Sequence, residues 1–127
     1  MNTAVIAFGS NIDPEQNIKK AKGMLAAGLN LKRESSTVKT RAIDRKDDPD
    51  FLNCAVLVET EKTHDELRKY LKNVEIKLKR SKTNDKYAPR TIDLDVVIWN
   101  GKIIDDDFYK RDFLKKTTIE VLPELEC

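Results

Sequence analysis

Cysteine is scarce in this sequence, and long apolar runs are absent. The cysteines are Cys54, inside an apolar stretch, and Cys127, the last residue, and they are too few for a disulfide framework. No apolar run reaches the roughly 18 residues that a membrane-spanning helix needs. The first residues lack the basic start and the long apolar stretch of a signal peptide. We therefore expect a reduced, cytoplasmic protein that has no membrane partner.

An excess of charge of one sign is also missing. Charged residues make up 36% of the chain, but the formal net charge is only +2. This balance argues against a protein that coats nucleic acid or binds a membrane through a polybasic surface. Residues 53–59, which are predicted to form a strand, contain no aromatic side chain on which a nucleotide base would stack. An RNA-binding module is therefore a disfavoured alternative, and we expect no nucleic-acid partner.

The length of the chain, 127 residues, is typical of one domain. We expect a single domain over residues 1–127 that acts as a monomer. Strands are expected in four stretches bounded by turn-forming residues, which are residues 3–8, 31–39, 51–59 and 93–99.

Two helices are predicted between these strands. Apolar residues at helical spacing indicate a helix over residues 14–28, with Asp13 as its N-cap. A second helix is predicted over residues 63–79, where Thr63 and Glu66 form a capping box. An apolar stripe along this second helix predicts the face that packs against a sheet.

The order strand, helix, strand, strand, helix, strand predicts an α+β protein with a ferredoxin-like βαββαβ core. In that arrangement we expect parallel and antiparallel pairing to be mixed, with the helices packed on one face of the sheet. Asn100 and Gly101 predict a type I′ hairpin turn after the last core strand. The remaining tail is only weakly periodic and is compatible with a short helix.

Two aspartates open the strand at residues 93–99 and carry the clearest chemical pattern. Side chains alternate between the faces of a strand, so Asp93 and Asp95 share one face. Leu94, Val96 and Ile98 are expected on the other face. Two neighbouring carboxylates repel unless a cation or a proton lies between them. Magnesium takes oxygen ligands and leaves room for phosphates, so this pair predicts a magnesium site.

Basic residues precede the aspartates in a segment that is predicted to be a loop. They are Arg80, Lys82, Lys86 and Arg90. Arginine in particular presents a planar fork of N–H donors that matches phosphate oxygens. Together with the carboxylates, this segment predicts nucleotide phosphate chemistry under a loop that closes on the ligand.

The same residues resemble a known family. Pro-Arg-Thr-Ile-Asp-Leu-Asp at 89–95 resembles the signature of 6-hydroxymethyl-7,8-dihydropterin pyrophosphokinase, a folate-pathway enzyme. Ala-Phe-Gly-Ser-Asn at 7–11 and Asp-Phe-Leu-Asn at 50–53 are similar to two further motifs of that family. Residues 111–113 and 120–123 match its C-terminal pattern less closely.

The resemblance implies transfer of pyrophosphate from ATP to the hydroxymethyl group of the pterin, with release of AMP. It implies two Mg²⁺ ions on Asp93 and Asp95, and Arg80 and Arg90 as catalytic arginines. The pterin-binding residues that it implies are Thr40, Ile43, Phe51, Asn53, Tyr87 and Phe113. The nucleotide-binding residues that it implies are Glu75, Lys82, Arg90, Val96 and Arg111.

The segment between Gly101 and Lys110 departs from the family pattern. It is much shorter than usual and contains three consecutive aspartates at 105–107. The alternative is therefore a relative with an incomplete ATP site, which binds a pterin or nucleotide without catalysis or with altered specificity.

Overall fold

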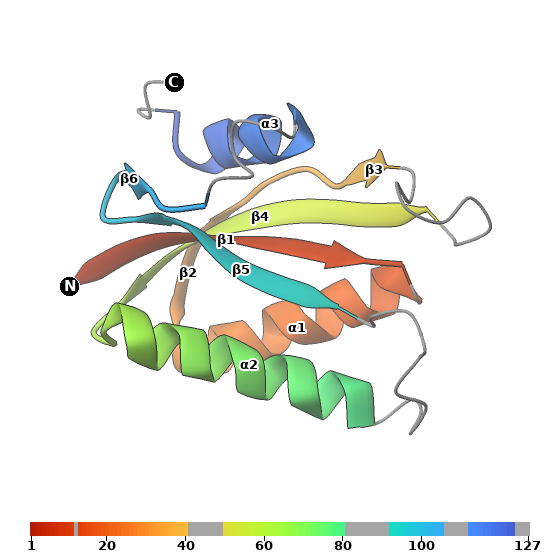
Figure 1. Cartoon of the computed structure of the whole chain (residues 1–127), viewed down its shortest axis with the longest axis horizontal. Helices are drawn as coiled ribbons and strands as arrows, with labels where there is room; N and C mark the ends of the chain where they lie inside the picture. Colours follow the sequence, from red (N-terminus) through yellow and green to blue (C-terminus); the bar gives the residue numbers. More distant parts are fainter. Residues whose placement is uncertain (12, 41–49, 81–91, 106–111, 124–127) are drawn as a thin grey trace.

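The computed structural model describes residues 1–11, 13–40, 50–80, 92–105 and 112–123, apart from the side chains of residues 79, 80 and 112. Within these ranges the chain forms a six-stranded sheet flanked by helices (Figure 1). The α+β class expected from the sequence is confirmed. No helix of the described part is long and apolar enough to cross a membrane.

The strands are β1 (Asn2–Ser10), β2 (Asn30–Glu34), β3 (Val38–Thr40), β4 (Phe51–Thr60), β5 (Asp93–Trp99) and β6 (Lys102–Ile103). They are ordered β2-β4-β1-β5-β6, and β3 also pairs with β4. Each pair of neighbours in the described sheet is antiparallel, so the expected mixture of parallel and antiparallel pairing was wrong. The helix Pro14–Gly28 connects β1 to β2 and the helix His64–Arg80 connects β4 to β5, and in both cases another strand lies between the two connected strands.

The helices cover both faces of the sheet. Helices α1 (Pro14–Gly28) and α2 (His64–Arg80) lie below the sheet in Figure 1, and α3 (Asp112–Val121) lies above it. The two core helices lie on one face of the sheet, as expected, and the tail helix α3 covers the other face. The weakly periodic tail does form a short helix, as the sequence allowed.

The start of α2 confirms the predicted capping box. The Thr63 N–H donates to Glu66 Oε1 at 3.0 Å, and the Glu66 N–H donates to Thr63 Oγ1 at 3.2 Å. The start of α1 differs, because Asp13 has a left-handed backbone with φ of 39° and its side chain makes no cap hydrogen bond. The position of that N-cap was predicted correctly.

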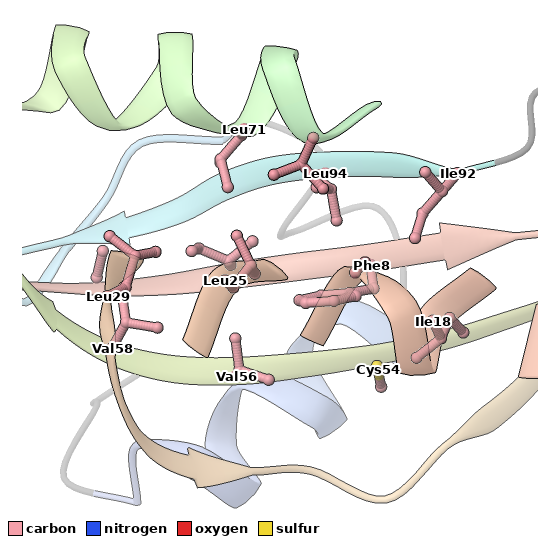
Figure 2. Packing of buried hydrophobic residues seen from close by; sticks show 14 of the residues in the cluster. Phe8, Ile18, Leu25, Leu29, Cys54, Val56, Val58, Leu71, Ile92 and Leu94 are labelled. Atoms are coloured by element: carbon pink, nitrogen blue, oxygen red, sulfur yellow. The ribbon is translucent and has the colours of Figure 1, made fainter. Parts of the chain in front are cut away.

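A large apolar cluster, here the helix-side cluster, fills the space between the sheet and helices α1 and α2 (Figure 2). Burial of a leucine, isoleucine or phenylalanine side chain contributes roughly 1.5–3 kcal/mol, so the many buried side chains of this cluster stabilise the fold. Its members include Ile6, Phe8, Leu25, Val56, Val58, Leu67, Leu71, Ile92 and Leu94.

A second cluster, here the α3-side cluster, lies between α3 and the other face of the sheet. Its buried members are Val5, Ala55, Leu57, Val97, Ile98, Leu114 and Val121. Because consecutive residues of a regular strand alternate between the two clusters, a side chain there can be assigned to a face from its neighbours.

A bulge in β5 changes this assignment partway along the strand. Val96 is opposite Ile6, but Ile98 is opposite Val5, so Val97 is an extra residue between them. Val97 and Ile98 consequently both belong to the α3-side cluster. The expectation that Ile98 shares a face with Leu94 and Val96 was wrong because one added residue reverses the alternation.

The hairpin after β5 is the predicted one. Asn100 and Gly101 have φ values of 50° and 84°, and Trp99 pairs directly with Lys102. Positive φ at both central residues is the mark of a type I′ turn, which glycine and asparagine adopt most easily.

The stretch 31–39 forms two strands rather than the one expected. Between β2 and β3, the Ser35 N–H donates to the Ala55 carbonyl at 2.8 Å. The Ala55 N–H in turn donates to Ser35 Oγ at 2.8 Å, where a backbone carbonyl would normally accept. A serine side chain thus maintains the contact with β4 across a break in the strand.

Candidate functional site

Polar side chains from neighbouring strands meet at one end of the sheet. Gly9 of β1 is opposite Asn53 of β4 on one side and opposite Asp93 of β5 on the other. Adjacent strands lie roughly 4.8 Å apart, so the Cα atoms of Asn53 and Asp93 are separated by about 10 Å. Both side chains are on the α3 side, because their neighbours Cys54 and Leu94 belong to the helix-side cluster.

The residues between these polar groups are small. In the next row of the sheet, Ala7 lies between Ala55 and Asp95. A Cβ atom added to Gly9 would lie 3.3 Å from Asn53 Oδ1, which is tighter than most such contacts. Gly9 and Ala7, here called the floor, are half-buried and put no large side chain between the amide and the carboxylates. Sequence reasoning missed this floor. The signal for it was a pair of small residues, Ala7 and Gly9, two positions apart in a predicted strand and therefore on one face.

The amide of Asn53 is held from one side by β3. Its Nδ2 donates to Thr40 Oγ1 at 2.8 Å and to the Val38 carbonyl at 3.3 Å. Asn53 is only 6% exposed, so its orientation depends on these bonds. They leave Oδ1 directed toward Gly9. Thr40 and Asn53, two of the residues expected at the pterin site, are therefore in direct contact.

Two aromatic residues expected at the site also lie on the α3 side. Phe51 is two residues before Asn53 in β4 and is half-buried. Phe113, in the first turn of α3, is half-buried and packs against the α3-side cluster. Aromatic faces of this kind suit a flat heterocycle.

Asp93 is half-buried and Asp95 is exposed, and they share the α3 side of β5 as predicted. Among the described residues there is no group of three or more histidine, cysteine, aspartate or glutamate side chains that could enclose a metal ion. A pair of carboxylates nevertheless fits Mg²⁺, which keeps several waters and takes substrate phosphates as further ligands.

The aspartates also border a cleft between α2 and β5. The cleft has a volume of about 210 Å³ and is lined by Asp93 and Asp95 together with Arg68, Lys72 and Glu75 of α2. The three helix residues are spaced so that they share one face of α2. Sequence reasoning singled out Glu75 but missed Arg68 and Lys72.

Glu75 and Val96 meet the same cleft in different ways. Glu75 is half-buried, and its Oε2 accepts a hydrogen bond from the Leu94 N–H at 2.9 Å. Val96 is half-buried, packs against the helix-side cluster and lines the cleft.

The other expected site residues fall outside the described part of the chain. These are Ile43, Lys82, Tyr87, Arg90 and Arg111. Arg80 is the last residue of α2, and its side chain is also outside the described part.

Two potentially reactive side chains lie elsewhere. Cys54 is 1% exposed within the helix-side cluster, and burial raises the pKa of its thiol to about 11. It is therefore a protonated core residue at neutral pH. His64, in the first turn of α2, packs against Trp99 with the ring centroids 5.3 Å apart.

Comparisons with known proteins agree on one family. The family model described as 7,8-dihydro-6-hydroxymethylpterin-pyrophosphokinase (HPPK) matches residues 5–123. A Bacillus subtilis protein named 2-amino-4-hydroxy-6-hydroxymethyldihydropteridine pyrophosphokinase is 30% identical over 98% of this chain and 81% of its own length. The Haemophilus influenzae protein of the same name is 27% identical over 98% of this chain and 84% of its own length.

Longer relatives contain a similar segment. An Arabidopsis thaliana folate synthesis bifunctional protein is 34% identical, over 93% of this chain and 26% of its own length. The solved Plasmodium falciparum HPPK-DHPS structure covers 91% of this chain and 33% of its own, with a TM-score of 0.60 at 16% identity, which supports the fold. The family match over residues 5–123 confirms the resemblance carried by the motifs, and the chain belongs to the 7,8-dihydro-6-hydroxymethylpterin-pyrophosphokinase (HPPK) family.

Proposed function

We propose that this protein transfers pyrophosphate from ATP to the hydroxymethyl group of 6-hydroxymethyl-7,8-dihydropterin and releases AMP. Membership of the HPPK family and the names of the relatives support pyrophosphokinase activity in folate biosynthesis. The observation that carries most weight is the row formed by Asn53, Gly9 and Asp93. It puts a polar group suited to a heterocycle and a carboxylate suited to a metal on either side of Gly9.

The pterin would lie on the floor near Asn53. Its polar edge would bond to the Asn53 amide, whose orientation is set by Thr40. Phe51 and Phe113 would contact the flat faces of the ring, because aromatic stacking combines apolar burial with a defined orientation. Ile43 and Tyr87 are proposed as further pterin contacts by resemblance.

The phosphate groups would lie toward β5. We propose that Asp93 and Asp95 hold two Mg²⁺ ions, which would neutralise charge on the transferred group when bound. Arg80 and Arg90 are proposed to stabilise the charge that develops during transfer, since a guanidinium binds phosphate oxygens in a bidentate way.

The nucleotide is proposed to extend toward the cleft between α2 and β5. The proximity of Glu75 and Val96 to Asp95 in this cleft supports that direction. Lys82, Arg90 and Arg111 are proposed as further nucleotide contacts by resemblance.

The proposed reaction forms one bond and breaks one bond. The hydroxymethyl oxygen of the pterin attacks the β-phosphorus of ATP, and the bond from that phosphorus to the oxygen bridging it to the α-phosphorus breaks. AMP leaves with that bridging oxygen, and the hydroxyl proton passes to water. The row of residues would contribute by keeping a pterin bound at Asn53 close to a phosphate chain bound at β5, because fixed proximity removes much of the entropic cost of the encounter.

A relative that binds without turnover is not favoured. The family match extends through the aspartates and α3 rather than stopping at the short segment after Gly101. The two possibilities differ in turnover, so the same assay separates them.

The test is AMP release from Mg²⁺-ATP in the presence of the pterin. We expect turnover by the wild-type protein and a loss of at least about 100-fold in Asp95→Asn, because removal of a metal ligand removes charge stabilisation. Asp65→Asn is the matched control, since Asp65 is an exposed residue in the first turn of α2. Absence of turnover at high enzyme concentration, or equal activity of Asp95→Asn and wild type, would contradict the proposal.

We also propose that the protein acts as a single-domain monomer in the cytoplasm, without a nucleic-acid or membrane partner. The continuous sheet and the formal net charge of +2 support this. Light scattering at micromolar concentration tests the oligomeric state.

A further inference from the structure

We propose that Ser36 and Glu120 form a clamp that positions the pterin-binding side of the site. Glu120 is in the last turn of α3, and Ser36 lies between β2 and β3. The inference rests on the proposed function, because it concerns the residues that are proposed to hold the pterin. It assigns a positioning role to a contact outside the floor and the cleft.

The contact is a set of hydrogen bonds to one carboxylate. The Ser36 N–H donates to Glu120 Oε2 at 2.9 Å, and the Ser36 hydroxyl lies 2.8 Å from Oε1 and 2.9 Å from Oε2. Beside it, Arg33 Nη1 donates to the Val121 carbonyl at 3.4 Å. Residues more than eighty positions apart in the sequence are thus bonded, and the carboxylate bonds fix an orientation as well as a distance.

The connection that carries Ser36 is itself bonded to the sheet. Ser35 exchanges two hydrogen bonds with Ala55, one through its N–H and one through its hydroxyl. Ala55 is a buried member of the α3-side cluster and pairs with Ala7 of the floor. The clamp therefore joins α3 to the segment of β4 that lies beside the floor.

Each side of the clamp leads to a residue proposed to bind the pterin. On one side, the chain continues from Ser36 into β3, where Thr40 and the Val38 carbonyl hold the Asn53 amide. On the other side, α3 carries Phe113 in its first turn. A change in the distance between β3 and α3 would alter the spacing between the amide and the aromatic ring.

The clamp is poorly suited to a role in stability alone. Ser36 and Glu120 are exposed, and hydrogen bonds between exposed groups contribute little to folding because water competes for them. Leu114 and Val121 already attach α3 to the sheet through apolar burial. Loss of the clamp is therefore expected to leave the fold intact while the geometry between β3 and α3 becomes less defined.

The experiment compares Ser36→Ala, Glu120→Ala and the double variant with the wild-type protein. We expect the KM for the pterin to rise about fivefold in each single variant and by a similar factor in the double variant, because both remove one contact. The KM for Mg²⁺-ATP and kcat are expected to change less than twofold. Lys116→Ala is the matched control, since it removes an exposed charged side chain from the same helix.

Glu120→Gln is a further variant, and thermal unfolding checks that the fold of each variant is intact. Glutamine keeps one carbonyl acceptor for Ser36 and is expected to recover at least half of the lost pterin affinity. An unchanged pterin KM in both single variants, an equal rise in KM for both substrates, or the same rise in Lys116→Ala would overturn the clamp. Absence of turnover by the wild-type protein would instead overturn the proposed function, and with it this inference.

Discussion

The backbone N–H of Leu94 donates a hydrogen bond to the carboxylate of Glu75 at 2.9 Å, at a point between the two aspartates of β5. This stretch of β5 is at the edge of the described sheet, because β6 pairs only with Ile98 and Trp99. An unpaired N–H at a sheet edge needs an acceptor when it is turned toward protein. A carboxylate of α2 supplies it and so fixes the strand segment that carries Asp93 and Asp95.

Replacing Glu75 is therefore expected to affect stability as well as activity. Glu75→Ala leaves the Leu94 N–H without its acceptor, and we expect the free energy of unfolding to fall by about 1–2 kcal/mol. Glu75→Gln retains an acceptor oxygen and should lose less. Urea denaturation measures both, with Lys77→Ala as an exposed control on the same helix. Equal stability of Glu75→Ala and the control would contradict a stabilising role for the Glu75–Leu94 hydrogen bond.

Two glycines of α1 are expected to respond in opposite ways to alanine. A Cβ atom on Gly28 would lie 2.5 Å from Tyr70 Oη, whose hydroxyl also donates to the Met24 carbonyl. Gly28→Ala is therefore expected to destabilise the protein by about 1–3 kcal/mol, despite the better helix propensity of alanine.

Gly23 provides the comparison within the same helix. It has nothing within 4 Å of the added atom, so Gly23→Ala is expected to stabilise by about 0.5–1 kcal/mol. Thermal unfolding of the two variants under the same conditions gives the sign of each change. A stabilising effect of both substitutions would show that the Tyr70 contact is relieved at no cost, and a destabilising effect of both would contradict the prediction for Gly23.

The capping box of α2 is expected to give a pH-dependent contribution. Hydrogen bonds from the Thr63 backbone and side chain hold the pKa of Glu66 below its ordinary value of 4.5. A lowered pKa in the folded state means that ionised Glu66 stabilises the fold above the unfolded pKa. This contribution is lost as the pH falls through the lower, folded pKa.

The stability difference between wild type and Glu66→Gln should therefore be present at pH 7 and shrink below pH 4.5. Chemical denaturation at a series of pH values measures it. Glu61→Gln, an exposed residue before the helix, is the control. A difference that stays constant from pH 7 to pH 3 would rule out the ionised capping box as its source.

Thr40 is expected to affect pterin binding through Asn53. Thr40→Val keeps the shape but removes the hydroxyl that accepts from Asn53 Nδ2 at 2.8 Å. The buried amide then loses its shorter bond, and we expect pterin affinity to fall about tenfold because its orientation is no longer fixed. Thr40→Ser restores the hydroxyl and should restore most of the affinity, as measured by calorimetry. Equal affinity of the valine and serine variants for the pterin would show that the Thr40 hydroxyl does not contribute to pterin binding.

Much of the fold could be predicted because it follows from local patterns. The Asn100-Gly101 turn needs residues that tolerate positive φ, and the helix starting after Thr63 needs a reciprocal cap, so both are readable from a few letters. The shared face of Asp93 and Asp95 follows from strand alternation in the same way.

The features that escaped prediction depend on contacts between distant segments. At the break between β2 and β3 the Ser35 hydroxyl bonds to Ala55, and a lone serine has no sequence pattern that indicates this. The contact of Glu75 with Leu94 and that of Glu120 with Ser36 are likewise set by tertiary packing. The family resemblance singled out Glu75, but it did not indicate what Glu75 contacts.

The extra residue at Val97 restricts how the gene for this protein can change. The alternation of β5 reverses at that point. With this extra residue, Asp93 and Asp95 face the α3 side, and Ile98 and Trp99 still pair with Ile103 and Lys102 in the hairpin. Loss or gain of a single codon between Asp95 and Asn100 would rotate the aspartates to the opposite face or displace the hairpin. Substitutions in this interval are tolerable when they remain apolar, whereas its length is fixed. We therefore expect functional descendants of this sequence to vary in the identity of these residues but not in their number.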